Sequence, residues 1–234
     1  MDLELKLLIK ERGEASTTAE KELHRINYLC WDTISARDRQ INILEGEKAG
    51  LIDKLVRGAI PALFVEVTKR LSGEFDLVWE KLHVETRRFL EIADVFMQEP
   101  FVNSWPGGGA TCTYLAVKLE LLHRFNPFLC GELSGGLKKA GGDPVKLLLT
   151  FCRDTRRSLT QDERKAIKSA VRSVFGDRFE LTEHVRSMIE LLKTHRDNAQ
   201  HPEGGEPYRI ENLRVFREKI WTSGWLNSFI GRGL

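Results

Sequence analysis

Apolar residues recur with a helical period most clearly between Leu181 and Pro202. The stripe consists of Leu181, Val185, Met188, Leu192 and Ala199. This spacing places the five side chains on one face of a helix, and such a face packs against a core. Thr182 is suited to be the N-cap of this helix, while Pro202 and then Gly204-Gly205 end the helix.

Two helix starts earlier in the chain are marked by capping residues. Asp143 is suited to cap a helix over 144–159, since that helix begins with proline, which fits the first helical position. Thr160 and Glu163 form a capping-box pattern, which opens a helix that ends near Phe175. Its buried face is predicted to consist of Ile167, Ala170, Val171 and Val174.

The pattern predicts two further helices in the second half of the chain. Residues 114–125 are predicted to be helical, although part of this stretch alternates like a strand. A last helix is expected from about Ile210 to Ile220. Trp221 and Trp225 lie just beyond it, and we expect them to seal a core or an interface rather than to stack on bases.

The first hundred residues are also helical in pattern, but more highly charged. A short helix is predicted over 1–12, and a long one over 18–58. The apolar spacing of the long helix is loosely heptad, which is typical of a coiled-coil arm that pairs with another protein or breaks into shorter helices. Two helices follow over 62–71 and 75–98, divided near Ser72-Gly73, and their aromatic residues have the spacing of a core.

The main interruption of the helical pattern lies between Pro100 and Ala110. We predict a domain boundary here, between an N-terminal helical region over 1–99 and a helical domain over 100–234. The Gly107–Gly109 run lacks the lysine and the second spaced glycine of a phosphate-binding loop, so it is predicted to be a flexible loop. The predicted fold class is therefore all-α, a helical bundle with a long N-terminal helical arm.

Composition narrows the classes of protein and site. The chain has 234 residues, of which 41% are hydrophobic and 30% charged, as in soluble globular proteins. No apolar run is long enough for a transmembrane helix, so we expect no membrane partner. The four cysteines are far apart and form no metal-ligand pattern. We therefore expect free thiols in a reducing cytoplasm, no metal and no cofactor.

Positive charge is concentrated in one segment. Residues 138–178 hold eleven Lys and Arg against five Asp and Glu, a local charge of +6 in a chain whose net charge is only +2. Such a segment attracts a polyanion, although basic helices also present ordinary solvated faces. The candidate nucleic-acid-binding residues are Lys138, Lys139, Lys165, Lys168 and Arg172.

The end of the 181–202 helix is unusually polar. Arg196-Asp197-Asn198-Ala199-Gln200-His201 resembles the Arg-x4-6-His motif of HEPN domains, including the polar residue directly after the arginine. The resemblance implies an all-α bundle of four or more helices that is usually a homodimer. In many members it also implies metal-independent cleavage of RNA by toxins and antiviral-defence proteins.

Such cleavage uses the RNA's own 2′-hydroxyl as the nucleophile, and needs a base, an acid and a cation for the crowded phosphate. Arg196 is always charged and is suited to grip two phosphate oxygens. His201 is suited to be the general acid, because a helix C-terminus favours its protonated form. His201 of a second copy supplies the base in the dimer that the resemblance implies. Asp197 is placed to orient either Arg196 or His201.

Geometry and composition leave alternatives open. In a regular helix Arg196 and His201 point about 140° apart, so they converge only if the helix unwinds before Pro202. Arg196 and His201 are also typical helix C-terminal residues without catalysis, and His195 is expected to be a partly buried core histidine. A second hypothesis is a non-catalytic adaptor that dimerises, binds nucleic acid, or binds a protein through its N-terminal helices. Nucleotide binding is a third.

Overall fold

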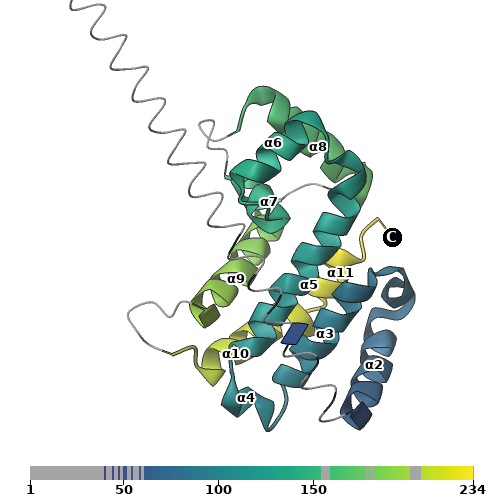
Figure 1. The fold of residues 1–234 in the computed structure, drawn as a ribbon, viewed down its shortest axis with the longest axis vertical. Helices are drawn as coiled ribbons and strands as arrows, with labels where there is room; N and C mark the ends of the chain where they lie inside the picture. Colours follow the sequence, from purple (N-terminus) through teal and green to yellow (C-terminus); the bar gives the residue numbers. More distant parts are fainter. Residues whose placement is uncertain are drawn as a thin grey trace, which may run out of the picture.

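The computed structural model describes residues 61–153, 159–177, 179, 182–200 and 207–233, together with isolated positions between 40 and 58. Every regular element within these ranges is helical and none is a strand (Figure 1), which confirms the all-α class. The helices predicted over 1–12 and 18–58 lie outside the described residues, apart from those isolated positions. No helix in the described ranges is both long and apolar enough to cross a membrane.

Within the described residues, the structure contains ten α-helices and three segments of other helical types. In chain order the α-helices are α2 (Pro61–Phe75), α3 (Val84–Phe96), α4 (Phe101–Ser104), α5 (Gly108–Phe125), α6 (Gly131–Lys139), α7 (Pro144–Cys152), α8 (Gln161–Phe175), α9 (Glu183–Gln200), α10 (Ile210–Phe216) and α11 (Trp225–Ile230). The segments of other types are the 3-10 helices η1 (Asp76–Lys81) and η2 (Asn126–Phe128), and the π-helix η4 (Arg217–Thr222).

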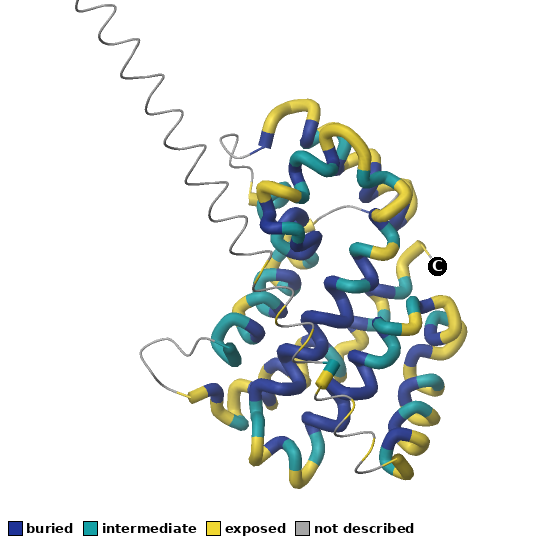
Figure 2. The backbone as a smooth tube through the Cα atoms, in the orientation of Figure 1, coloured by how far each residue is buried: buried dark blue, intermediate teal, exposed yellow. Residues whose placement is uncertain are grey.

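Helix α5 is the central element of the bundle. It is buried over most of its length, as the dark colour in Figure 2 shows, and α3, α7, α9 and α10 pack around it. A helix that is apolar on almost every side must be surrounded by other elements. The helix predicted over 114–125 is thus confirmed, and its start lies earlier than predicted, at Gly108.

The three glycines at the start of α5 allow two neighbouring helices to approach it closely. A Cβ atom added at Gly107 would lie 2.6 Å from the Cβ atom of Ala199 in α9. A Cβ atom added at Gly109 would lie 2.7 Å from the Cγ atom of Met97, just after α3. The prediction of a flexible loop here was wrong, because the missing side chains serve helix packing rather than loop mobility.

The helix boundary predicted near Ser72-Gly73 was also wrong. Helix α2 continues through both residues to Phe75, because Leu71 and Phe75 are buried on one face of it. The chain turns later, after η1, where Leu82 is extended and the ring of His83 accepts a hydrogen bond from the Glu85 backbone N–H.

Helices on both sides of the boundary predicted at residue 100 share one hydrophobic core in the described part of the chain. Helix α3 packs along α5, and the cluster of buried apolar side chains extends from Phe64 to Ile230. Helix α9 itself packs on α5, α7, α10 and η4, all of which follow residue 100.

The predicted caps are confirmed. Thr160 and Glu163 form the complete capping box of α8, and Asp143 caps α7 with Pro144 in the first turn. The Thr182 hydroxyl accepts a hydrogen bond from the Val185 backbone N–H at 3.3 Å, as expected of the N-cap of α9. Helix α7 ends at Cys152 rather than at residue 159, so its predicted end was wrong.

Replacing Thr160 by alanine should lower the free energy of unfolding by about 1 kcal/mol. The Glu163 backbone N–H then loses the hydroxyl that accepts its hydrogen bond, and the capping box keeps only one of its two bonds. The Thr160 hydroxyl accepts from the Glu163 backbone N–H, and the Glu163 carboxylate accepts from the Thr160 backbone N–H. Urea unfolding measures the loss. Thr160→Ser keeps the hydroxyl and should stay near the wild type; an equal loss in both variants would contradict this role.

The C-terminal segment departs from the single helix predicted to Ile220. Regular α-helix ends at Phe216, and η4 continues it with the wider π-helical turn as far as Thr222. Both tryptophans pack as predicted. Trp225 is buried, and Trp221 packs against the core, where its indole N–H donates to the Thr113 hydroxyl at 3.1 Å.

Candidate functional site

The last turns of α9 lie against the first half of α5. Arg196 is only 5% exposed, and its guanidinium carbon lies 4.9 Å from the centre of the Tyr114 ring. One turn further on, Ala199 touches the backbone at Gly107. A guanidinium over an aromatic face is a favourable cation–π arrangement. The arginine of the sequence motif is therefore packed inside the bundle, between α9 and α5.

Tyr114 connects Arg196 to a third helix. Its hydroxyl donates a hydrogen bond of 2.7 Å to the Asp143 carboxylate, and both residues are fully buried. The other oxygen of Asp143 accepts from the backbone N–H groups of Val145 and Lys146 at 2.9 and 3.2 Å. Burial and the Asp143 charge raise the pKa of Tyr114 well above its usual value, so its hydroxyl remains a donor.

Asp197 lies beside Arg196, as the sequence hypothesis requires of an orienting residue. Its carboxylate accepts a hydrogen bond from the Arg196 guanidinium at 2.7 Å and also pairs with Lys193. Burial alone would raise the pKa of Asp197, but the hydrogen bonds from Lys193 and Arg196 lower it below its usual value. Asp197 is therefore a carboxylate at neutral pH, suited to orient a cation and not to donate a proton.

His195 is a partly buried histidine, as predicted. Its Nδ1 atom lies 2.6 Å from the Tyr208 hydroxyl oxygen, and its ring lies 5.2 Å from the Phe216 ring. Burial, and to a smaller degree the charge of Lys219, lowers the pKa of His195. The neutral ring acts as a hydrogen-bonding part of the contact between α9 and α10. His201, the other half of the motif, lies outside the described residues.

The pKa of His195 predicts a pH-dependent stability. Because its folded value is below 6.5, the unfolded chain binds more protons as the pH falls through 6.5, and stability is lost there. The unfolding temperature should therefore fall more in the wild type than in His195→Gln when the pH is lowered from roughly 7.5 to 5.5. This pH range lies above the usual pKa values of carboxylates, so they do not titrate in it. Thermal unfolding at both pH values measures the difference, and equal losses would assign it to other groups.

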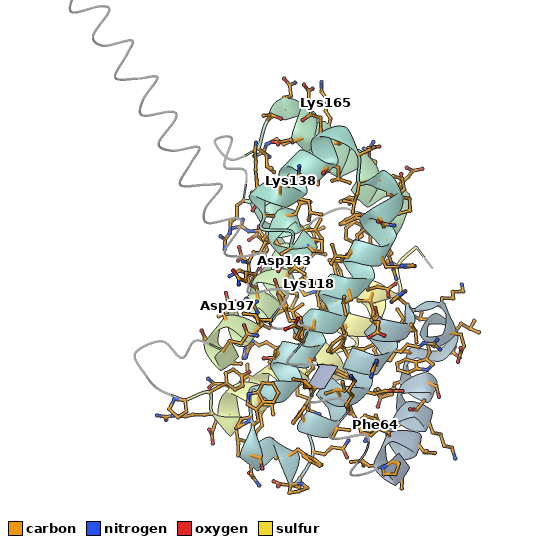
Figure 3. The ribbon with its side chains drawn as sticks, in the orientation of Figure 1. Phe64, Lys118, Lys138, Asp143, Lys165 and Asp197 are labelled. Carbon is orange, nitrogen blue, oxygen red and sulfur yellow. The ribbon has the colours of Figure 1, made fainter. Side chains whose placement is uncertain are left out.

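The structure places the predicted basic residues on the surface, but away from the motif. Lys165, Lys168 and Arg172 are exposed along α8, opposite its buried face. Lys138 and Lys139 are exposed at the end of α6. Figure 3 shows Lys138 and Lys165 toward one end of the molecule and Asp197 nearer its middle. An RNA that contacted both regions would have to extend along the bundle.

Some of these basic residues have acidic neighbours. Lys139 pairs with the buried Glu163 carboxylate at 2.8 Å, and Lys165 lies 3.4 Å from Asp162. Lys139 therefore contributes to the packing of α6 on α8 as well as to surface charge.

Other kinds of site find no support in the described ranges. No group of three or more metal-ligating side chains occurs there. Cys112, Cys130 and Cys152 carry thiols and form no disulfide, as expected, and Cys30 lies outside the described residues. Burial raises the pKa of Cys152 to about 11, which makes it a poor nucleophile at neutral pH.

Sequence reasoning missed Tyr114 as the partner of Arg196, and treated Asp143 only as a cap. One signal was present in the sequence. Arg196 follows Leu192 by four residues and precedes Ala199 by three, so it lies on the apolar stripe itself.

Comparisons with protein-family models, with curated proteins and with solved structures found no match. The proposals that follow therefore rest on the residues of the chain itself.

Proposed function

We propose that this protein is a metal-independent endoribonuclease of the HEPN type, a toxin or antiviral-defence effector that acts as a homodimer. The proposal rests on Arg196, which is held in one orientation by Tyr114 and Asp197 in the last turns of α9. The described helix ends at Gln200, and His201 is the next residue in the sequence. Arg196 and His201 are five residues apart in the sequence, and a cation and a histidine are the groups that this chemistry needs.

The chemical step would be an internal transfer on RNA. The 2′-oxygen attacks the adjacent phosphorus and the 5′-oxygen leaves, which gives a 2′,3′-cyclic phosphate and a free 5′-hydroxyl. Arg196 would stabilise the charge of the five-coordinate phosphorus, and His201 would donate a proton to the leaving 5′-oxygen. His201 of a second copy would accept the proton of the 2′-hydroxyl. Asp197 would orient the guanidinium.

The burial of Arg196 favours a second candidate function. A guanidinium that is 5% exposed and covered by the Tyr114 ring contacts a phosphate only after its surroundings move. In the second function Arg196 is a structural residue, and the chain is a non-catalytic helical module. It would dimerise, bind a protein through its N-terminal helices, or bind nucleic acid through Lys165, Lys168 and Arg172, which are exposed on α8.

RNA cleavage in the presence of EDTA distinguishes the two functions. Purified protein is incubated with single-stranded and structured RNA, and the products are separated on a gel and their ends identified. The ribonuclease proposal expects products with 2′,3′-cyclic phosphate ends. Intact RNA that binds the protein, with affinity lost in Lys165→Glu/Lys168→Glu/Arg172→Glu, supports the non-catalytic module instead.

A further inference from the structure

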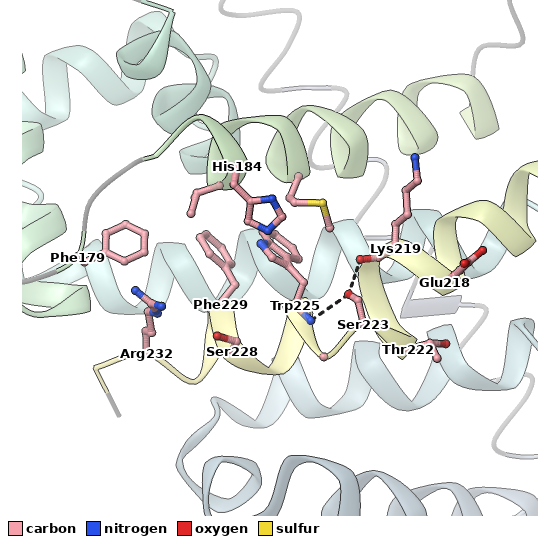
Figure 4. A pocket seen from close by; sticks show the side chains of 13 residues that line it. Phe179, His184, Glu218, Lys219, Thr222, Ser223, Trp225, Ser228, Phe229 and Arg232 are labelled. Atoms are coloured by element: carbon pink, nitrogen blue, oxygen red, sulfur yellow. Dashed lines mark hydrogen bonds between the residues drawn. The ribbon is translucent and has the colours of Figure 1, made fainter.

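A hollow of about 670 Å³ lies between the first half of α9 and the C-terminal segment of the chain. Figure 4 shows its lining, which comes from Phe179 before α9, from α9, and from the stretch between Glu218 and Arg232 that includes η4 and α11. Its volume lies within the range of small-molecule sites in proteins. Neither Arg196 nor Asp197 lines it, so it is separate from the site described above.

The floor of this hollow is aromatic. The rings of Trp225 and Phe229 are stacked, with their centres 4.8 Å apart and their planes 10° from parallel. Phe179 lies beside them, with its ring centre 6.4 Å from that of Phe229, and Met188 of α9 also lines the hollow. Each of these three aromatic residues is at most 8% exposed, so only a small part of each ring reaches the hollow, and an apolar group would pack on those parts.

The charged side chains lie at the two ends of the hollow. Arg232 lies at the Phe179 end, with its guanidinium carbon 5.5 Å from the centre of that ring. Lys219 lies toward the other end, and Glu218 lies beyond it, far from Arg232 (Figure 4). The Arg232 end therefore has a cation, and no carboxylate of the described lining is beside it. An anion would be favoured there.

The turn that carries Arg232 is fixed in place. The Arg124 guanidinium donates to the backbone oxygens of Ile230 and Arg232, the latter at 2.7 Å. Gly233 has φ +79°, and a Cβ atom there would lie only 2.0 Å from the Val174 backbone oxygen. The backbone at Gly233 is thus held tightly against α8, and Arg232 starts from a defined position beside the hollow.

The wall opposite α9 is also held in one conformation. The Ser223 hydroxyl donates to the Lys219 backbone oxygen at 2.6 Å and accepts from the Trp225 backbone N–H at 3.2 Å (Figure 4). These bonds connect the π-helix η4 to the first residue of α11. π-helical turns are rare in proteins, and those that occur often lie at functional sites. Here η4 supplies Glu218, Lys219 and Thr222 to the lining.

We propose that this hollow binds a small organic anion with a flat aromatic body. The body would lie against Met188 and the exposed parts of Trp225 and Phe229, and the carboxylate, sulfonate or phosphate group would pair with Arg232. Ser228, which lines the hollow near the same end, would supply a further hydrogen bond. The site does not depend on the proposed cleavage of RNA.

Titration with 8-anilinonaphthalene-1-sulfonate, a fluorescent aromatic anion, tests the site directly. Wild-type protein should bind one molecule. Arg232→Gln should weaken binding at least about 10-fold, since a charge-assisted hydrogen bond is lost. Lys165→Gln is the matched control, because it removes one exposed cation from α8 without touching the hollow, and it should bind like the wild type. Thermal unfolding of each variant confirms that it is folded.

A neutral analogue and a filling variant complete the test. N-phenyl-1-naphthylamine carries no charge, so its binding should be the same in wild type and Arg232→Gln. Ser228→Phe, which places a ring in the hollow, should abolish binding of both probes. The proposal is overturned if Ser228→Phe binds the anion like the wild type, or if Arg232→Gln affects the anion no more than the neutral probe.

Discussion

Replacing His201 by alanine should slow RNA cleavage at least about 100-fold, because positioned general acid–base groups typically contribute this much or more. In the proposed dimer each His201 serves one of the two proton transfers, so the single substitution removes both the acid and the base. Initial rates of cleavage of end-labelled RNA in EDTA measure the effect. A His201→Ala protein that cleaves as fast as the wild type would exclude the proposed ribonuclease.

His123→Ala is the matched control for this prediction. His123 is exposed near the end of α5, where its ring lies 4.5 Å from that of His83, and it is not part of the motif. The His123→Ala variant should therefore cleave RNA at the wild-type rate. Arg196→Lys keeps the charge but loses the planar fork of the guanidinium, so it should also be slow. Thermal unfolding of each variant separates loss of activity from loss of fold.

The parts of the fold that the sequence predicted are those fixed by local interactions. Helix α8 is the clearest case, because its start depends on Thr160 and Glu163, three residues apart, and its buried face on a period of 3.6 residues. The same holds for Asp143 as the cap of α7 and Thr182 as the cap of α9. These features need only residues within one or two turns of each other.

The parts that the sequence did not predict depend on contacts between distant residues. Gly107 is a helix-packing position only because Ala199 lies against it. Arg196 is buried because its guanidinium packs over the ring of Tyr114, which is far away in the sequence. A motif specifies which side chains are present, and the packing around them decides whether they are exposed. The same limit applies to the hollow beside Trp225, which three separate segments form.

Replacing Asp143 by alanine should destabilise the protein by roughly 3 kcal/mol, since it removes a helix cap and leaves a buried hydroxyl without its acceptor. Asp143 is fully buried and accepts hydrogen bonds from two helix N–H groups and from Tyr114. Asp143→Asn keeps an oxygen for the cap and should lose less. Urea unfolding at neutral pH measures both variants, and a loss below about 1 kcal/mol in Asp143→Ala would contradict the buried network.

A double-mutant cycle with Tyr114→Phe isolates the contact between the two side chains. Tyr114→Phe alone leaves one Asp143 oxygen without its donor, and Asp143→Ala alone leaves the tyrosine hydroxyl without its acceptor. In the double variant neither group remains unsatisfied, so its loss should be smaller than the sum of the single losses by about 1–2 kcal/mol. Because the Tyr114 ring also supports Arg196, RNA cleavage should fall in Asp143→Ala even at temperatures where the variant is fully folded. Unchanged cleavage there would assign the network to stability alone, whereas a slower rate would identify Asp143 as a residue that positions Arg196.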